Sequence, residues 1–162
     1  MRRDRAAWVL GAGAILALAV LAAHGWGLVS PFQYDDKLEI LLNPNMAGLG
    51  RWRELWIYNP SRFVLLCTFA LPYNTTGLET WPFHAVNLVI HGLNAALVAA
   101  LAHRVLLSDG RDADRGTRVA ALAAGLLFAV HPLLVEGVTY ISGRSSSLAT
   151  TVYLACFWVL DD

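Results

Sequence analysis

Two adjacent carboxylates, Asp35 and Asp36, are the first residues in this sequence that could do chemistry, and Glu39 follows them closely. Neighbouring carboxylates can act as a general base, bind a divalent metal ion or remain as solvated charge in a loop. The pair by itself leaves all three interpretations open. A divalent metal ion is therefore the one cofactor that the residues leave open, and its ligands stay unassigned.

A stripe of polar residues forms the second group, in a segment that is otherwise apolar. It comprises His84, Asn87, His91 and Asn94. Successive helical residues are rotated by about 100°, so this spacing places all four on one face, over about 15 Å of helix. Polar side chains on such a face either hydrogen-bond to neighbouring helices or contact a ligand directly. The spacing matches no zinc-binding motif, and both interpretations stay open for His84 and His91.

The third group follows an apolar run that a proline interrupts, and it comprises His131, Glu136, Ser142 and Arg144. The preceding run, residues 119–130, would make about 18 Å of helix, whereas the hydrocarbon core of a membrane is about 30 Å thick. We therefore expect this group at or below the membrane surface, either buried in protein or lining a watery cavity. A charged residue at that depth is a candidate for function, although Arg144 could instead extend toward a lipid headgroup.

The overall composition indicates the environment of these groups. The 162 residues are 57% hydrophobic and 15% charged, with a mean hydropathy of +0.51 and 12 basic against 12 acidic residues. Such an apolar chain is not disordered, and without an excess of basic residues it is not expected to bind nucleic acid. The composition favours a membrane protein with lipid as a partner.

Four apolar segments are predicted to be membrane helices. They are residues 6–23, 84–107, 119–130 and 148–160. A secretory signal peptide is the alternative for the first, but its apolar stretch exceeds the roughly 7–15 residues typical of signal peptides. The chain is thus predicted to be all-α, a polytopic helical membrane protein with about four transmembrane helices. We expect residues 1–162 to form a single membrane domain.

The segment between the first two spans, residues 30–83, is predicted to be an external loop with one or two interfacial helices. The first of these helices is indicated by apolar residues that share one helical face. They are Leu49, Trp52, Leu55 and Trp56. Such a helix would lie in the membrane interface. Residues 63–73 are too short to cross a membrane and predict a second interfacial or re-entrant helix.

The distribution of arginine residues predicts the orientation. The first five residues contain three Arg, and the loop between the second and third spans contains four more. Because Lys and Arg accumulate on the cytoplasmic side of a membrane, the N-terminus and residues 104–118 are predicted to be cytoplasmic. Residues 30–83 and 131–146 then face the opposite side, which brings all three polar groups to one outward-facing cavity.

An acidic pair beside an arginine and several histidines suits chemistry on a phosphate-bearing ligand. A carboxylate would take a proton from an acceptor, while Arg144 and a histidine would offset the charge of the leaving phosphate.

These residues, in this order, resemble the start of a membrane glycosyltransferase. The matching residues are Tyr34, Asp35, Asp36, Ile40, Asn43, Pro44, His84, Asn87, His91, Asn94, Phe128, His131, Pro132, Glu136, Tyr140, Gly143, Arg144 and Leu148. The group comprises bacterial, tetratricopeptide-repeat relatives of the transmembrane O-mannosyltransferases, within the GT-C superfamily. The resemblance covers about residues 30–155.

The resemblance implies transfer of a sugar, mannose in the relatives, from a polyprenyl-phosphate donor to a hydroxyl acceptor such as protein Ser/Thr. It implies a multi-pass protein of the cell (inner) membrane that acts on the outer face. Asp35 and Asp36 would be the catalytic pair, and His131, Glu136 and Arg144 would line the lipid-phosphate side.

The sequence departs from the family pattern at three points. Arg62 stands where relatives have Arg-Pro-Leu, but Phe63 follows it here, and Ser145 follows the Gly-Arg pair where relatives have an acid nearby. Members of the superfamily also have about twice as many spans and, in this group, a tetratricopeptide tail. An N-terminal fragment that is inactive alone is therefore an alternative.

Two other functions remain open. A non-catalytic membrane scaffold would use the polar stripe to bind other helices. An intramembrane serine protease would need a serine beside a glycine and a histidine on another span, which Ser142 and His91 superficially offer. The place of the first glycine in its motif is occupied by Tyr140, which disfavours the protease.

Overall fold

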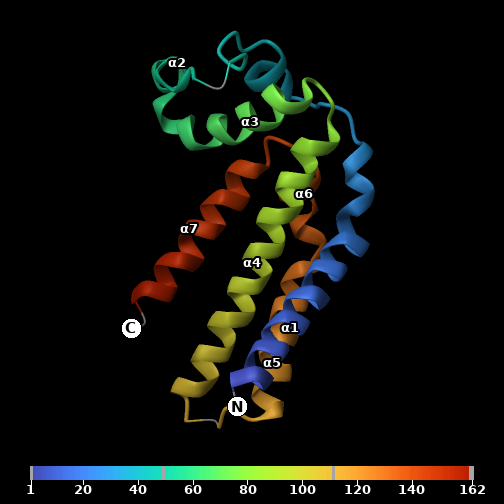
Figure 1. Cartoon of the computed structure of the whole chain (residues 1–162), viewed down its shortest axis with the longest axis vertical. Coiled ribbons are helices and arrows are strands. Elements are labelled where there is room, and N and C mark those ends of the chain that lie inside the picture. Colours follow the sequence, from blue (N-terminus) through green and yellow to red (C-terminus); the bar gives the residue numbers. More distant parts are fainter. Residues whose placement is uncertain (1, 49, 111, 161–162) are drawn as a thin grey trace.

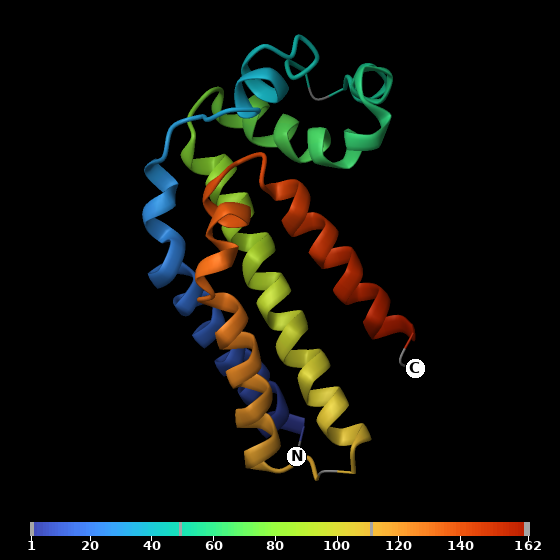
Figure 2. The same ribbon diagram turned by 180° about the vertical axis from the view of Figure 1, so that it is seen from behind.

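Four long apolar helices form the body of the molecule in the computed structural model, which describes residues 2–48, 50–110 and 112–160 (Figure 1). They are α1 (Arg2–His24), α4 (Trp81–Ser108), α5 (Arg115–Ala129) and α7 (Arg144–Leu160). In views from opposite sides α4 lies between α7 and the pair formed by α1 and α5 (Figures 1 and 2). The prediction of an all-α membrane protein is confirmed.

Two helices in the described part of the chain are long and apolar enough to cross a membrane, namely Ala6–Val29 and Trp81–Ser108. The pair Arg115–Ala129 and Pro132–Thr139 would make a third span if it is counted as one broken helix, bent by 49°. The predicted fourth span corresponds to α7, which has 17 residues. The count of four spans therefore stays a prediction.

The bend follows directly from the sequence. Proline has no N–H to donate and disfavours helical geometry at the residue before it, so α5 cannot continue past His131. His131 adopts an extended conformation, and its Nδ1 accepts a hydrogen bond from the backbone N–H of Leu133 at 3.3 Å. The chain then re-enters helix through η4 (Pro132–Leu134) and α6 (Val135–Thr139).

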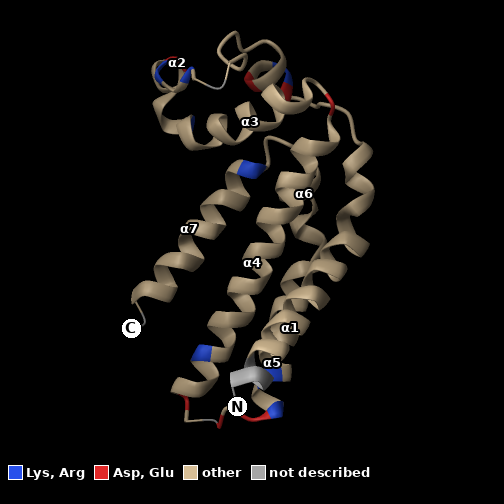
Figure 3. Cartoon of the chain, in the orientation of Figure 1, with Lys and Arg blue, Asp and Glu red and all other residues tan. Residues whose placement is uncertain are grey.

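Charged residues gather at the two ends of the molecule and are sparse along the helices between them (Figure 3). No Asp, Glu, Lys or Arg occurs in residues 6–34, 80–103 or 119–135. This pattern fits a bilayer, whose core strongly disfavours charge. The chain is accordingly a membrane protein.

A cap of shorter helices covers one end of the bundle (Figures 1 and 2). The elements that lead into it and form it are η1 (Gly25–Val29), η2 (Lys37–Leu41), α2 (Trp52–Tyr58), η3 (Pro60–Arg62) and α3 (Phe63–Thr76). The two helices predicted between the first spans correspond to α2 and α3, and α3 lies across the bundle rather than along it.

The cap has its own hydrophobic core. Its buried members include Ile40, Met46, Leu55, Leu66, Phe69, Phe83 and Ile141. Leu55 of α2 packs into this core, whereas Trp52 and Trp56 on the same predicted face are exposed. Leu49, the remaining member of that face, lies outside the described residues.

A second hydrophobic core joins α1, α4 and α5, whose backbones approach one another closely there. It contains Leu16, Val20, Leu88, Ala95, Ala129 and Val138. A Cβ atom placed on Gly125 would lie 2.8 Å from the carbonyl oxygen of Ala95 and 2.8 Å from the Cβ of Ala99. Small residues of this kind let membrane helices pack closely.

Candidate functional site

Asp36 is a buried carboxylate that ties the segment after α1 to the turn before α7. It is 1% exposed. Its Oδ1 accepts hydrogen bonds from the backbone N–H of Ser142 at 2.9 Å and from the Ser142 hydroxyl at 2.6 Å. Its Oδ2 accepts a third from the backbone N–H of Gln33 at 2.9 Å. These contacts fix the two segments to each other although they are 106 residues apart.

Asp35, the neighbouring carboxylate, has an exposed side chain. Its backbone N–H donates a hydrogen bond to the Tyr140 hydroxyl at 3.0 Å, and the Tyr34 ring meets the Tyr140 ring edge-on with centroids 6.1 Å apart. Tyr34 has a φ of 38°, an uncommon left-handed conformation for a residue other than glycine. The adjacent carboxylates therefore have opposite environments on a backbone that is held in a strained turn.

Arg144 is enclosed by protein and is 0% exposed. Its Nε donates to Asn87 Oδ1 at 2.6 Å, and its Nη2 donates to the carbonyl oxygen of Phe83 at 2.7 Å. Its Nη1 donates to the carbonyl and hydroxyl oxygens of Thr68 at 2.8 and 3.0 Å. Rather than extending toward lipid, this guanidinium joins α3, α4 and α7.

The polar stripe of α4 bonds to other segments of the same chain, and all four of its residues are buried. Asn87 Nδ2 donates to the carbonyl of Tyr140 at 2.9 Å, and Asn94 Nδ2 donates to the carbonyl of Ser147 at 2.9 Å. The hydrogen-bonding interpretation of the stripe therefore describes this structure.

The two histidines of the stripe also hydrogen-bond to other segments of the chain. His84 Nε2 lies 3.0 Å from the carbonyl oxygen of Ser30, and His91 Nε2 lies 3.0 Å from that of Ala129. A carbonyl oxygen can only accept, so each Nε2 carries the proton and donates it. These bonds hold the residue after η1 and the last residue of α5 against α4.

The remaining predicted site residues lie apart from this buried network. Arg62 pairs with Glu39 across the cap, with Nη1 and Oε1 3.0 Å apart, and the arginine side chain is 43% exposed. His131 and Glu136 are exposed at the bend and on α6. Within the described residues, no three His, Cys, Asp or Glu side chains cluster closely enough to hold a metal ion.

A pocket of about 230 Å³ opens between α4, the bend, α6 and α7. It is lined by His91, Asn94, Phe128, Leu133, Leu134, Glu136, Gly137, Gly143, Ser146, Ser147 and Thr150. Two lining hydroxyls already donate their hydrogens to carbonyls, since Ser147 donates to Gly137 at 2.8 Å and Thr150 to Ser146 at 2.9 Å.

The polar groups that remain in this pocket include both acceptors and donors of hydrogen bonds. The hydroxyl oxygens of Ser147 and Thr150 keep free lone pairs, and an ionised Glu136 carboxylate is an acceptor only. Asn94 accepts from Thr151 at 2.7 Å through its Oδ1 and uses one of its two Nδ2 hydrogens for Ser147, and Ser146 adds a hydroxyl that can donate. The pocket therefore suits a ligand that both donates and accepts hydrogen bonds, such as a polyol.

Several residues of this network could not be identified from the sequence pattern. Phe83 holds Arg144 through a main-chain carbonyl, which any residue type could supply, and Thr68 does so through its carbonyl and its hydroxyl. Gln33 contributes only its backbone N–H to Asp36. Tyr140 is among the residues on which the resemblance to a membrane glycosyltransferase rests, so the sequence did single it out.

Comparison with known proteins supplies an independent observation. Human protein O-mannosyl-transferase TMTC1 is 31% identical over 161 residues, which cover 91% of this chain and 17% of that protein. Protein O-mannosyl-transferase Tmtc2 of Drosophila melanogaster is 31% identical over 140 residues, covering 78% of this chain and 14% of that protein. Human protein O-mannosyl-transferase TMTC2 is 30% identical over 141 residues, with coverage of 78% and 16%. The chain is similar to protein O-mannosyl-transferases.

The similarity covers only a small part of each of these relatives. The chain spans between 14% and 17% of the length of these three relatives. No family model matches the chain, and no solved structure matches it.

Proposed function

We propose that this chain is a glycosyltransferase module of the GT-C type, which transfers a sugar from a polyprenyl-phosphate donor to a hydroxyl acceptor. Similarity to protein O-mannosyl-transferases supports mannose as the sugar and protein Ser/Thr as the acceptor. The observation that carries the proposal is the exposed Asp35 carboxylate, which belongs to a residue whose backbone N–H is bonded to the Tyr140 hydroxyl.

In the proposed reaction Asp35 is the general base. Its carboxylate takes the proton of the acceptor hydroxyl, and the hydroxyl oxygen forms a bond to the anomeric carbon of the donor sugar. The bond from that carbon to the phosphate oxygen breaks, and the polyprenyl phosphate leaves with the electron pair. Asp36, which is buried and accepts three hydrogen bonds, acts as a positioning residue for Asp35.

The pocket beside α6 is the proposed place of the donor sugar. Tyr140 connects it to Asp35, because the Tyr140 backbone N–H donates to the Glu136 carbonyl at 3.2 Å while its hydroxyl accepts from Asp35. The polar lining would receive the sugar hydroxyls, with Glu136 among the acceptors.

The lipid phosphate needs a different set of residues. Of the residues predicted to contact a phosphate or another ligand, Arg144, His84 and His91 direct hydrogen bonds into the protein. The exposed His131 and Arg62 are therefore the proposed phosphate contacts.

The proposed orientation places the cap and the site on the outer face of the cell (inner) membrane, with the N-terminus cytoplasmic. The concentration of arginines in the N-terminal tail and in residues 104–118 supports it. A non-catalytic scaffold is the second candidate. The observation that favours it is that the α4 stripe and Arg144 hold segments of this chain together instead of facing a ligand, although the stripe is then not available to bind helices of another protein.

The test is sugar transfer in membrane vesicles that carry the full chain, with radiolabelled polyprenyl-phosphate mannose and a Ser/Thr-rich peptide. We expect Asp35→Asn to lower the rate about 100-fold or more, the usual range for removal of a general base. Glu79→Gln, which changes another exposed carboxylate of the same end, should leave the rate unchanged. Resistance of each variant to trypsin controls for folding.

Two results would contradict the proposal. Transfer by Asp35→Asn at the wild-type rate would show that another group is the base. Absence of transfer by the wild-type chain, above vesicles that lack it, would overturn catalysis by this chain and leave the scaffold.

A further inference from the structure

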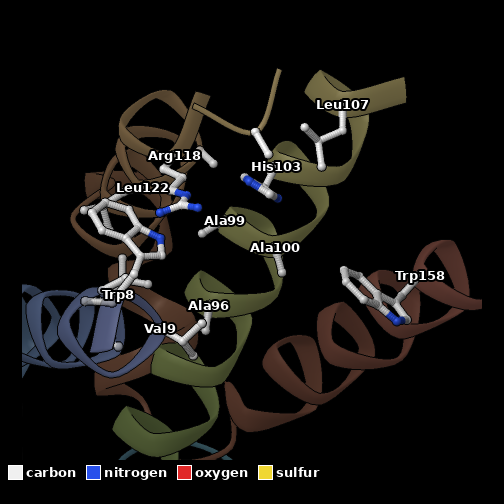
Figure 4. Close-up of a pocket in the computed structure, with 15 residues that line it drawn as sticks. Trp8, Val9, Ala96, Ala99, Ala100, His103, Leu107, Arg118, Leu122 and Trp158 are labelled. Carbon is white, nitrogen blue, oxygen red and sulfur yellow. The ribbon is translucent and has the colours of Figure 1, made fainter. Parts of the chain in front are cut away.

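A large cavity lies at the end of the bundle remote from the cap, between α1, α4 and α5 and beside the end of α7 (Figure 4). Its volume is about 910 Å³. Small residues create much of the space, since their side chains do not fill the gap between the helices. They are Ala12, Gly13, Ala96, Ala99, Ala100 and Ala121.

Two polar side chains enter this apolar space. Figure 4 shows the Arg118 guanidinium and the His103 imidazole turned toward the same part of the cavity, with the Trp8 indole beside the arginine. Both polar residues are half-buried, and among the residues that the structure describes neither has a hydrogen-bond or ion-pair partner. A guanidinium in an apolar cavity is expected to bind an anion, because burying an unpaired charge costs free energy.

The position of these side chains along the helices indicates how deep in the membrane that anion would lie. Arg118 lies in the first turn of α5, and His103 lies in the last turns of α4, close to the charged loop that connects the two helices. Trp8 and Trp158 lie at the same end, as tryptophans do at a membrane–water interface. The anion would therefore be at the depth of lipid headgroups, with the apolar cavity extending toward the bilayer core.

We propose that this cavity binds an anionic phospholipid, with an acyl chain between α1 and α4 and the phosphate at Arg118 and His103. Guanidinium groups bind phosphate through two parallel hydrogen bonds, and basic pockets between membrane helices bind anionic headgroups. A further helix packed into the same space would bury the arginine beside apolar side chains. The site is independent of the proposed sugar transfer, because it lies at the opposite end of the bundle.

The test is lipid binding to the purified full chain, titrated with phosphatidylglycerol or phosphatidylcholine and measured by native mass spectrometry. We expect phosphatidylglycerol to bind about tenfold more tightly, the effect of one charge-assisted contact. Arg118→Gln should abolish that preference. Arg115→Gln is the matched control, since it removes an exposed arginine of the same helix end that does not line the cavity.

A second variant tests the acyl-chain part separately. A Cβ on Gly13 would meet no atom within 4 Å, so Gly13→Leu should fold while its side chain occupies the cavity. We expect it to weaken binding of both lipids. Equal affinity of the wild-type chain for the two lipids would overturn the proposal. The proposal would also be overturned if Arg118→Gln and Arg115→Gln changed the lipid preference equally, or if Gly13→Leu bound both lipids as tightly as the wild-type chain.

Discussion

Replacement of Arg144 by lysine separates two roles for this residue, structural support and contact with a lipid phosphate. Arg144 donates four hydrogen bonds, to Asn87, Phe83 and twice to Thr68, and its guanidinium carbon lies 4.6 Å from the centre of the Phe69 ring. Lysine keeps the charge but offers a single nitrogen in place of a planar fork. Some of the buried oxygens would then lose their donor.

The expected magnitude follows from these contacts. An unsatisfied buried acceptor costs about 1–3 kcal/mol, and breaking a buried charged network costs about 3–5 kcal/mol. We therefore expect Arg144→Lys to lower the free energy of unfolding by about 3 kcal/mol, with loss of the contact between the cap and α7. Arg53→Lys is the control, because Arg53 is exposed and has no proposed role, so that the change should alter stability by about 0.5 kcal/mol or less.

The assay is unfolding by sodium dodecyl sulfate in mixed micelles, followed by tryptophan fluorescence. The two variants and the wild-type chain are compared under identical lipid conditions, and a polyprenyl-phosphate photoprobe is cross-linked to each. If Arg144→Lys unfolds like the wild-type chain but no longer cross-links, the structural argument is refuted and the phosphate role is correct.

Two further predictions concern the same framework. Asp36→Asn should destabilise the cap by about 2 kcal/mol, because an amide cannot accept all three hydrogen bonds, whereas Ser142→Ala removes one donor and should cost about 1 kcal/mol. Limited trypsin digestion of the cap measures both losses. Equal protection of the wild-type chain and the two variants would contradict the prediction. Gly125→Ala should cost about 1–3 kcal/mol, since its Cβ would overlap α4, while Gly92→Ala, where a Cβ meets no atom within 4 Å, should be neutral or slightly stabilising. Unfolding midpoints decide this second pair, and a smaller loss for Gly125→Ala than for Gly92→Ala would refute the packing of α4 against α5.

The helices were predictable because their causes are local. Residues 84–107 were predicted as a span, and α4 covers Trp81–Ser108. The run at residues 119–130 lies in α5, Arg115–Ala129, whose end is set by the nearby proline. The irregular polar segment after it was also predicted, since the apolar run is too short to cross a membrane.

The site was less predictable because its causes are distant in the sequence. Asp35 and Asp36 are identical in type and adjacent, and the difference in their burial depends on Ser142, 106 residues away. Arg144 is likewise buried by Thr68, 76 residues away, and Phe83, 61 residues away. Spacing along one helix revealed a polar face, but the partners of that face belong to other helices.

The order of synthesis delays the hydrogen bonds of Arg144 and Ser142. Both residues are synthesised after the cap, α4 and α5, so the cap has no attachment to α7 while those helices insert. From Phe83 to Ser142 a ribosome needs roughly 3–12 seconds at the usual rate of synthesis. During that interval the carboxylate of Asp36 and the amide of Asn87 lack the partners that Ser142 and Arg144 supply in the folded structure.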